Sequence, residues 1–130
     1  MAGGLCNAGL TEIAKWITGD GSPTNWAYAN AYMGVGDNPA AYAAGQTDLQ
    51  AATNKLRKAM FDSSWPSRSG LVMSWKSKFL AGEANFHWQE VIVANDASAG
   101  SILFRDVLDL GTKPNTQEWW LQYDVTLSAA

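Results

Sequence analysis

The sequence of 130 residues predicts a mainly β protein, an antiparallel β-sandwich of jelly-roll-like type with one or two short N-terminal helices. Short runs of alternating apolar and polar residues recur along the chain, which is typical of strands with one buried face. All four prolines fall between these runs, as the hydrogen bonding of a sheet requires. We expect one β-sandwich domain, residues 10–130, preceded by a flexible arm, residues 1–9.

The N-terminal part of the chain carries the weaker patterns. Residues 1–9 are small and rich in glycine, so we expect an arm with little structure of its own. A short helix is predicted between Thr11, which can cap it, and Gly19, which ends it. A strand over residues 29–35 and a helical turn or two near residues 47–54 follow. The apolar stripe of the predicted helix consists of Leu10, Ile13, Ala14 and Ile17.

The strongest strand patterns lie in the second half of the chain. They cover residues 58–63, 71–80, 86–94, 102–108 and 117–128. In the last of these strands Trp119 and Trp120 point to opposite faces, because successive residues of a strand alternate. If Trp119 is in the core, Trp120 points outward among polar neighbours. We expect one of three alternatives to cover it: the N-terminal segment, another chain, or a sugar ring that stacks on the indole.

The strand over residues 86–94 carries a carboxylate within a row of large apolar side chains. With a period of two, Glu90 shares one face with Phe86, Trp88 and Ile92. A buried carboxylate needs a partner, and hairpin pairing brings Arg105 within reach. We therefore predict a buried pair of Glu90 and Arg105, with Arg57 or the backbone N–H groups of a loop as alternative partners. No second catalytic group lies nearby in the sequence, so this structural role is favoured over a role as an acid or base.

Composition and charge exclude several classes of protein. The net charge is −3 and the basic residues form no long run, which argues against binding of nucleic acid. A single cysteine excludes an intrachain disulfide, and no apolar run approaches the length of a membrane span. The only histidine, His87, lies between two aromatic residues and is far from the only cysteine. We therefore expect no enzymatic activity, no cofactor and no metal ion.

The low charged fraction of 16% and the seven tryptophans suggest burial against partner chains, because aromatic residues are enriched at the cores of interfaces. The same tryptophans can also fill the core of the domain. Candidate interface residues are Trp120, Trp65 and His87.

Five segments, taken in order, resemble small structural proteins of tailed bacteriophages. They are AGLTEIAKWITGD (8–20), AYMGVGDNP (31–39), TDLQAATNKLRKAM (47–60), GEANFHWQEVIVAN (82–95) and GSILFRDVL (100–108). In such phage proteins the comparable segments form an apolar helix, a short strand, a Leu…Arg segment, an F-x-W-x-E strand and a leucine–arginine strand. The sequence departs from this pattern at residues 91–93, where a Gly-Leu-Phe type run is commoner.

The resemblance implies a non-enzymatic β-sandwich module of a virion. We favour a capsid decoration (cement) protein, which stabilises the shell by bridging capsomers of the major capsid protein. A tail or fibre attachment module is the alternative, and it is less favoured because the chain ends directly after its last strand. We expect a homotrimer on the capsid surface, made in the host cytoplasm, since shells offer threefold sites. The second alternative is a carbohydrate-binding module that uses exposed Trp120, Trp65 or Tyr42.

Overall fold

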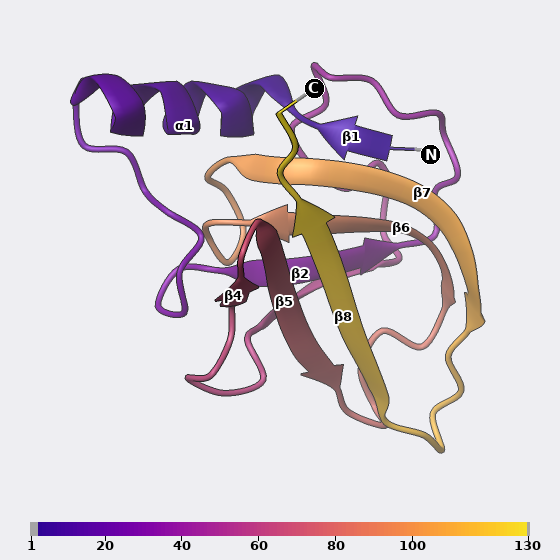
Figure 1. Ribbon diagram of the computed structural model, residues 1–130. Helices are drawn as coiled ribbons and strands as arrows, with labels where there is room; N and C mark the ends of the chain where they lie inside the picture. Colours follow the sequence, from indigo (N-terminus) through magenta and orange to yellow (C-terminus); the bar gives the residue numbers. More distant parts are fainter. Residues whose placement is uncertain (1–2, 130) are drawn as a thin grey trace.

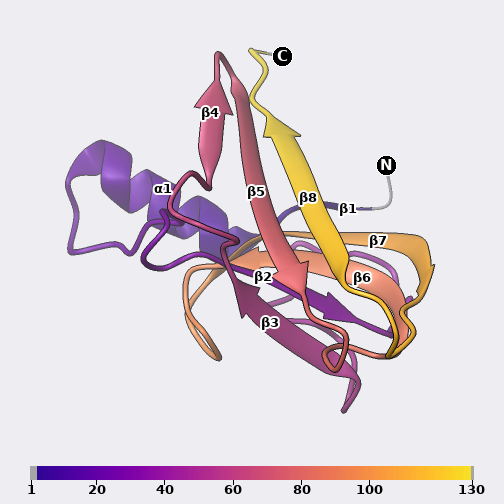
Figure 2. The ribbon, with the colours of Figure 1, turned by 90° about the horizontal axis from the view of Figure 1, so that it is seen from below.

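The computed structural model describes residues 3–129 and shows two antiparallel sheets with one helix beside them (Figure 1). The predicted β-sandwich with a short N-terminal helix is confirmed. The five-stranded sheet has the order β1-β7-β6-β2-β3 and the three-stranded sheet the order β4-β5-β8, and the strands of the two sheets run across each other (Figure 2). The elements are β1 (Gly3–Leu5), α1 (Asn7–Thr18), β2 (Tyr32–Gly36), β3 (Lys55–Ala59), β4 (Ser67–Ser69), β5 (Val72–Phe79), β6 (His87–Ala94), β7 (Ile102–Thr112) and β8 (Trp119–Thr126).

The N-terminal segment is ordered against the sheet, which corrects the expected flexible arm over residues 1–9. Strand β1 pairs antiparallel with β7, where Gly4 lies opposite Arg105. Cys6 is fully buried, and its backbone N–H donates to Leu103 O at 2.9 Å. These backbone hydrogen bonds and the burial of Cys6 offset the entropy cost that the small residues incur on ordering. Residues 1–2 of the expected arm lie outside the described residues.

Helix α1 begins four residues before Thr11 and ends as predicted, with Gly19 in the left-handed conformation (φ 71°). It approaches β7 most closely at Gly9, which is buried. An added Cβ at Gly9 would lie 2.7 Å from the backbone oxygen of Ile102. Because the side of α1 that carries Gly9 faces the sheet, only part of the predicted apolar stripe is buried. Ile13 packs against the core, whereas Leu10 and Ile17 are exposed.

The middle of the chain differs most from the prediction. No helical turn forms over residues 47–54, and residues 37–54 make one long irregular loop instead. Strand β3 begins and ends a few residues before the predicted strand 58–63, because residues 55–59 pair with β2. The short strand β4 was not predicted.

The pairing of β6 with β7 contains a bulge that changes which face of the sheet the side chains of β6 point to. Trp88 lies opposite Gly111 and Glu90 lies opposite Val107, so one residue of β6 faces three of β7 between these pairs. Trp88 therefore packs between the two sheets, whereas Glu90 lies on the outer face of the five-stranded sheet. The prediction that Trp88 and Glu90 share one face is wrong for this reason.

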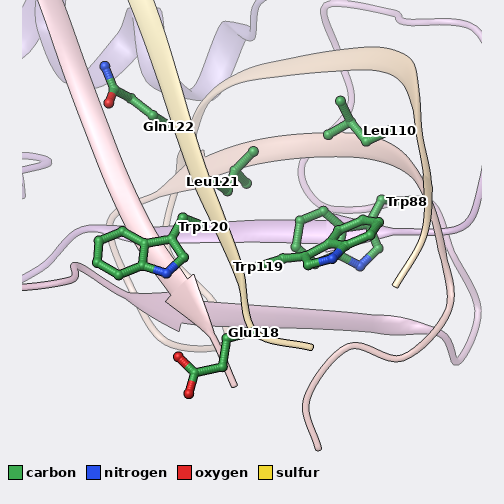
Figure 3. Close-up of a pocket in the computed structure, with 7 residues that line it drawn as sticks. All are labelled: Trp88, Leu110, Glu118, Trp119, Trp120, Leu121 and Gln122. Carbon is green, nitrogen blue, oxygen red and sulfur yellow. The ribbon is translucent and has the colours of Figure 1, made fainter. Parts of the chain in front are cut away.

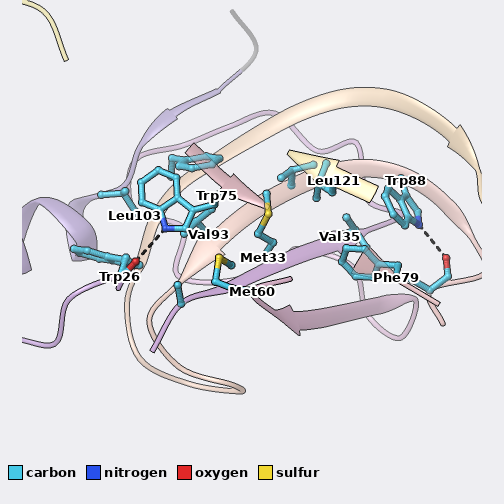
Figure 4. Packing of buried hydrophobic residues seen from close by; sticks show 14 residues of the cluster. Trp26, Met33, Val35, Met60, Trp75, Phe79, Trp88, Val93, Leu103 and Leu121 are labelled. Atoms are coloured by element: carbon cyan, nitrogen blue, oxygen red, sulfur yellow. Dashed lines mark hydrogen bonds between the residues drawn. The ribbon is translucent and has the colours of Figure 1, made fainter. Parts of the chain in front are cut away.

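Side chains of both sheets meet in the main core. Trp119 points inward from β8 and lies against Trp88, with ring centroids 5.1 Å apart, whereas Trp120 points away (Figure 3). The core runs from Trp26 and Trp75 at one end to Phe79 and Trp88 at the other (Figure 4). A second, smaller cluster lies on the outer face of the five-stranded sheet, under the loop of residues 37–54, and contains Cys6, Leu49, Ile92, Ala94 and Ile102.

Candidate functional site

Glu90 and Arg105 form a buried ion pair next to the smaller cluster, as the sequence predicts. Both side chains are fully buried, and Arg105 Nε donates to Glu90 Oε1 at 3.0 Å. Glu90 also accepts hydrogen bonds from the backbone N–H groups of Gln50 (2.7 Å) and Ala51 (2.9 Å). Arg57, the alternative partner, instead binds Asp48 at 2.9 Å.

The guanidinium of Arg105 completes the connection to the loop of residues 37–54. Its Nη1 donates to Ala40 O at 2.9 Å, and its Nη2 donates to Asn38 O at 3.2 Å. Charged groups that are hydrogen bonded on all sides in this way have no lone pair or proton directed at a substrate. The arrangement therefore supports a structural role, in which the pair holds an irregular loop against the sheet.

Five side chains gather on the outer face of the three-stranded sheet, and we call this group the aromatic–lysine cluster. Its members are Phe61, Trp65, Lys76, Lys78 and Trp120. Strand pairing places Lys78 directly opposite Trp120, because β5 and β8 run antiparallel. Phe61 reaches the cluster from the segment after β3, where its backbone N–H donates to Lys76 O at 2.8 Å.

The cluster is held together by stacking and cation–π contacts. The ring centroids of Phe61 and Trp120 lie 4.5 Å apart, and Lys76 Nζ lies 4.6 Å from the Trp120 ring and 5.4 Å from the Trp65 ring. Each exposed contact of this kind contributes about 0.5–1 kcal/mol. Trp120 nevertheless keeps 50% of its surface exposed. The result is an ordered, amphipathic surface with two ammonium groups, of which Lys78 is bound to Glu118 at 2.8 Å.

Two of the three predicted interface residues, Trp120 and Trp65, thus lie in one surface, and His87 does not. His87 Nε2 lies 2.6 Å from Asp109 Oδ1. The hydrogen bond with His87 and the backbone N–H of Gly111 hold the pKa of Asp109 below its usual value. Within residues 3–129 no hydroxyl or thiol is hydrogen bonded to this imidazole, so the pair lacks a nucleophile.

Trp120 is covered in part by Lys76 and Lys78 of its own sheet and by Phe61 of the segment after β3. The described part of the N-terminal segment lies along β7 and does not cover it. Lys76 and Lys78 were not singled out in the sequence, although antiparallel pairing of residues 71–80 with 117–128 would have placed them beside Trp120. Phe61 had no comparable signal, since it lies in an irregular segment.

Within the described part of the chain no group of three or more His, Cys, Asp or Glu side chains is placed to hold a metal ion. No helix among residues 3–129 is long and apolar enough to cross a membrane. Comparisons with protein-family models, with curated proteins and with solved structures gave no match. The fold and the site define a two-sheet antiparallel β-sandwich with an exposed aromatic–lysine cluster on its smaller sheet.

Proposed function

We propose that the chain is a non-enzymatic structural protein of a tailed-phage virion, a capsid decoration protein that binds the major capsid protein through the aromatic–lysine cluster. The half-exposed indole of Trp120 on an ordered surface is the observation that carries this proposal. The resemblance of the five sequence segments to phage structural proteins gives it the context of a virion.

The cluster has the properties of the centre of an interface. Tryptophan is strongly enriched among the few residues that supply most of the binding free energy, at about 2 kcal/mol or more each. The rings of Phe61 and Trp120 are already fixed against each other and by Lys76, so binding costs little further side-chain entropy. Lys76, which forms no ion pair with a described residue, favours an acidic group on the partner surface, whereas Lys78 is already paired with Glu118.

The proposal includes self-association. A decoration protein stabilises a shell through many copies of one contact, each burying about 1,000 Å² or more. Closed threefold symmetry matches the threefold positions of a shell, so a homotrimer that bridges capsomers is the arrangement we propose.

The test uses purified virions and a matched pair of variants. We expect the protein at a copy number close to that of the capsomers, measured by quantitative mass spectrometry. Trp120→Ala should lose binding to shells while remaining folded, with a melting temperature lower by only a few degrees, because the indole is half exposed and its contacts contribute about 0.5–1 kcal/mol each. Gln122→Ala, on the same strand and the same face, is the control and should bind normally.

Two outcomes would replace this proposal. A few copies confined to the tail would favour the tail or fibre attachment module. Binding of the isolated protein to a glycan array, lost in Trp120→Ala, would favour the carbohydrate-binding module.

A further inference from the structure

The outermost strands of the two sheets are protected unequally. Strands β1 and β4 have three residues each, and β3 has five, three of them basic. Strand β8 has eight residues, contains no lysine and no proline, and pairs with β5 without a bulge. Native sheets normally protect their edges by short strands, lysine, proline or bulges, because an unpaired edge is a template for another strand. Strand β8 is thus the long edge without this protection.

The hydrogen bonding of β8 shows which backbone groups face outward. Leu127 N–H donates to Leu71 O at 2.9 Å, and in an antiparallel ladder every second residue bonds to the same neighbour. The backbone groups of Trp120, Gln122 and Asp124 therefore point away from β5. Among residues 3–129 these outward groups have no hydrogen-bond partner in another element.

An apolar groove of about 510 Å³ lies beside the same residues (Figure 3). Its apolar walls are Trp88 and Leu110 from the five-stranded sheet and Trp119 and Leu121 from β8. The ends of β6 and β7 continue past β8, so the three-stranded sheet leaves this part of the larger sheet uncovered (Figure 1). A further strand at the usual spacing of about 4.8 Å from β8 would direct alternate side chains into the groove.

We propose that β8 binds an extended segment of a partner chain as an additional strand, with apolar residues at alternate positions and a basic residue beside Asp124. Asp124 accepts a hydrogen bond from Gln122 Nε2 at 3.2 Å and forms no ion pair with any described residue. Opposite charges on adjacent strands stabilise their pairing. Main-chain hydrogen bonds would supply affinity and the groove specificity for the alternate side chains.

A different chain fits this edge better than a second copy of β8 does. Strand β8 contains no basic residue, so twofold pairing of β8 with itself would leave Asp124 of both copies without an opposite charge. An extended segment with a basic residue at this position supplies that charge. This inference goes beyond the proposed function and does not require it, because the backbone edge of β8 and the side chains on the face of the sheet are different surfaces that meet only at Trp120.

The test is a titration of ¹⁵N-labelled protein with a synthetic nine-residue peptide in which valine alternates with lysine and threonine. We expect saturable shifts and slower hydrogen exchange at the amides of Trp120, Gln122 and Asp124. The amides of Leu121 and Tyr123, which face β5, should change little. Gln122→Pro removes one outward N–H at a position where edge strands tolerate proline, and should weaken binding by up to about tenfold. Gln122→Thr keeps the N–H and should bind like the wild type.

A second variant keeps the test decisive if Gln122→Pro unfolds. Asp124→Asn should weaken binding of the lysine peptide and leave unchanged the binding of a peptide with glutamine in place of lysine. Absence of shifts at the three outward amides at millimolar peptide would overturn the inference, as would shifts confined to Phe61, Trp65, Lys76 and Lys78. Protection that appears with protein concentration alone would show self-pairing and overturn the choice of a foreign segment. Absence from virions would refute only the proposed function.

Discussion

Replacing Glu90 by alanine is expected to lower the free energy of unfolding by about 3–5 kcal/mol. The substitution removes the acceptor of Arg105 Nε and of the backbone N–H groups of Gln50 and Ala51. Each buried donor left without a partner costs about 1–3 kcal/mol, and the charged guanidinium costs more. Opening of the loop of residues 37–54 to water recovers part of this cost. The remaining loss is still a large fraction of the 5–15 kcal/mol that is typical of a domain.

Urea unfolding followed by tryptophan fluorescence measures this change, and limited proteolysis of residues 37–54 reports the opening of the loop. Gln89→Ala is the control, since the neighbouring side chain is only half-buried, and it should change stability by less than about 1 kcal/mol. The double variant Glu90→Leu with Arg105→Leu should recover part of the loss, because a buried ion pair can often be replaced by apolar residues. Equal unfolding midpoints for Glu90→Ala and Gln89→Ala would refute the reasoning.

Three further predictions concern the N-terminal segment and pH. Gly9→Ala should destabilise the fold by about 1–3 kcal/mol, because the added methyl would meet the backbone of β7, whereas Gly82→Ala has open space and should leave the melting temperature unchanged. Burial raises the pKa of the Cys6 thiol and shields it from solvent. A thiol reagent at pH 8 should therefore label Cys6 only as fast as the N-terminal segment opens. Immediate labelling would contradict the pairing of β1. Hydrogen bonds from Lys58 and from the backbone N–H of Leu80 lower the pKa of Glu83 in the folded protein. Ionised Glu83 therefore stabilises the fold above the unfolded pKa of about 4.3, and this contribution is lost as pH falls through the folded pKa. Urea unfolding of Glu83→Gln should therefore show a smaller loss of stability between about pH 5 and pH 3 than the wild type.

Alternation of apolar and polar residues was sufficient to predict β5 and β8, because each of these strands buries one face against the other sheet. Strands β6 and β7 were predicted from their apolar runs, and both faces are covered along much of their length. The pairing of Glu90 with Arg105 was also predictable, since a carboxylate in an apolar strand requires a partner wherever it is buried. Both predictions depend on local pattern or on a strict physical requirement. They did not depend on the relative positions of distant segments.

The features that escaped prediction depend on contacts between distant segments. Small residues such as Gly4 gave no sign that β1 would pair with β7, because the pairing uses backbone groups that every residue carries. The period of two placed Trp88 and Glu90 on one face, whereas the extra residues of β7 separate them. Phe61 meets Trp120, and Trp65 meets Lys76, only after the segment that follows β3 has folded onto β5.

The pairing of β1 with β7 also fixes an order of events during protein synthesis. The ribosome makes Gly3–Leu5 long before residues 104–106, with which they pair. Until β7 leaves the ribosome, Gly3–Leu5 lack the strand with which they pair, and Cys6 is open to solvent. The chain length at which Cys6 of a nascent chain becomes protected from a thiol reagent therefore shows when β7 joins the sheet.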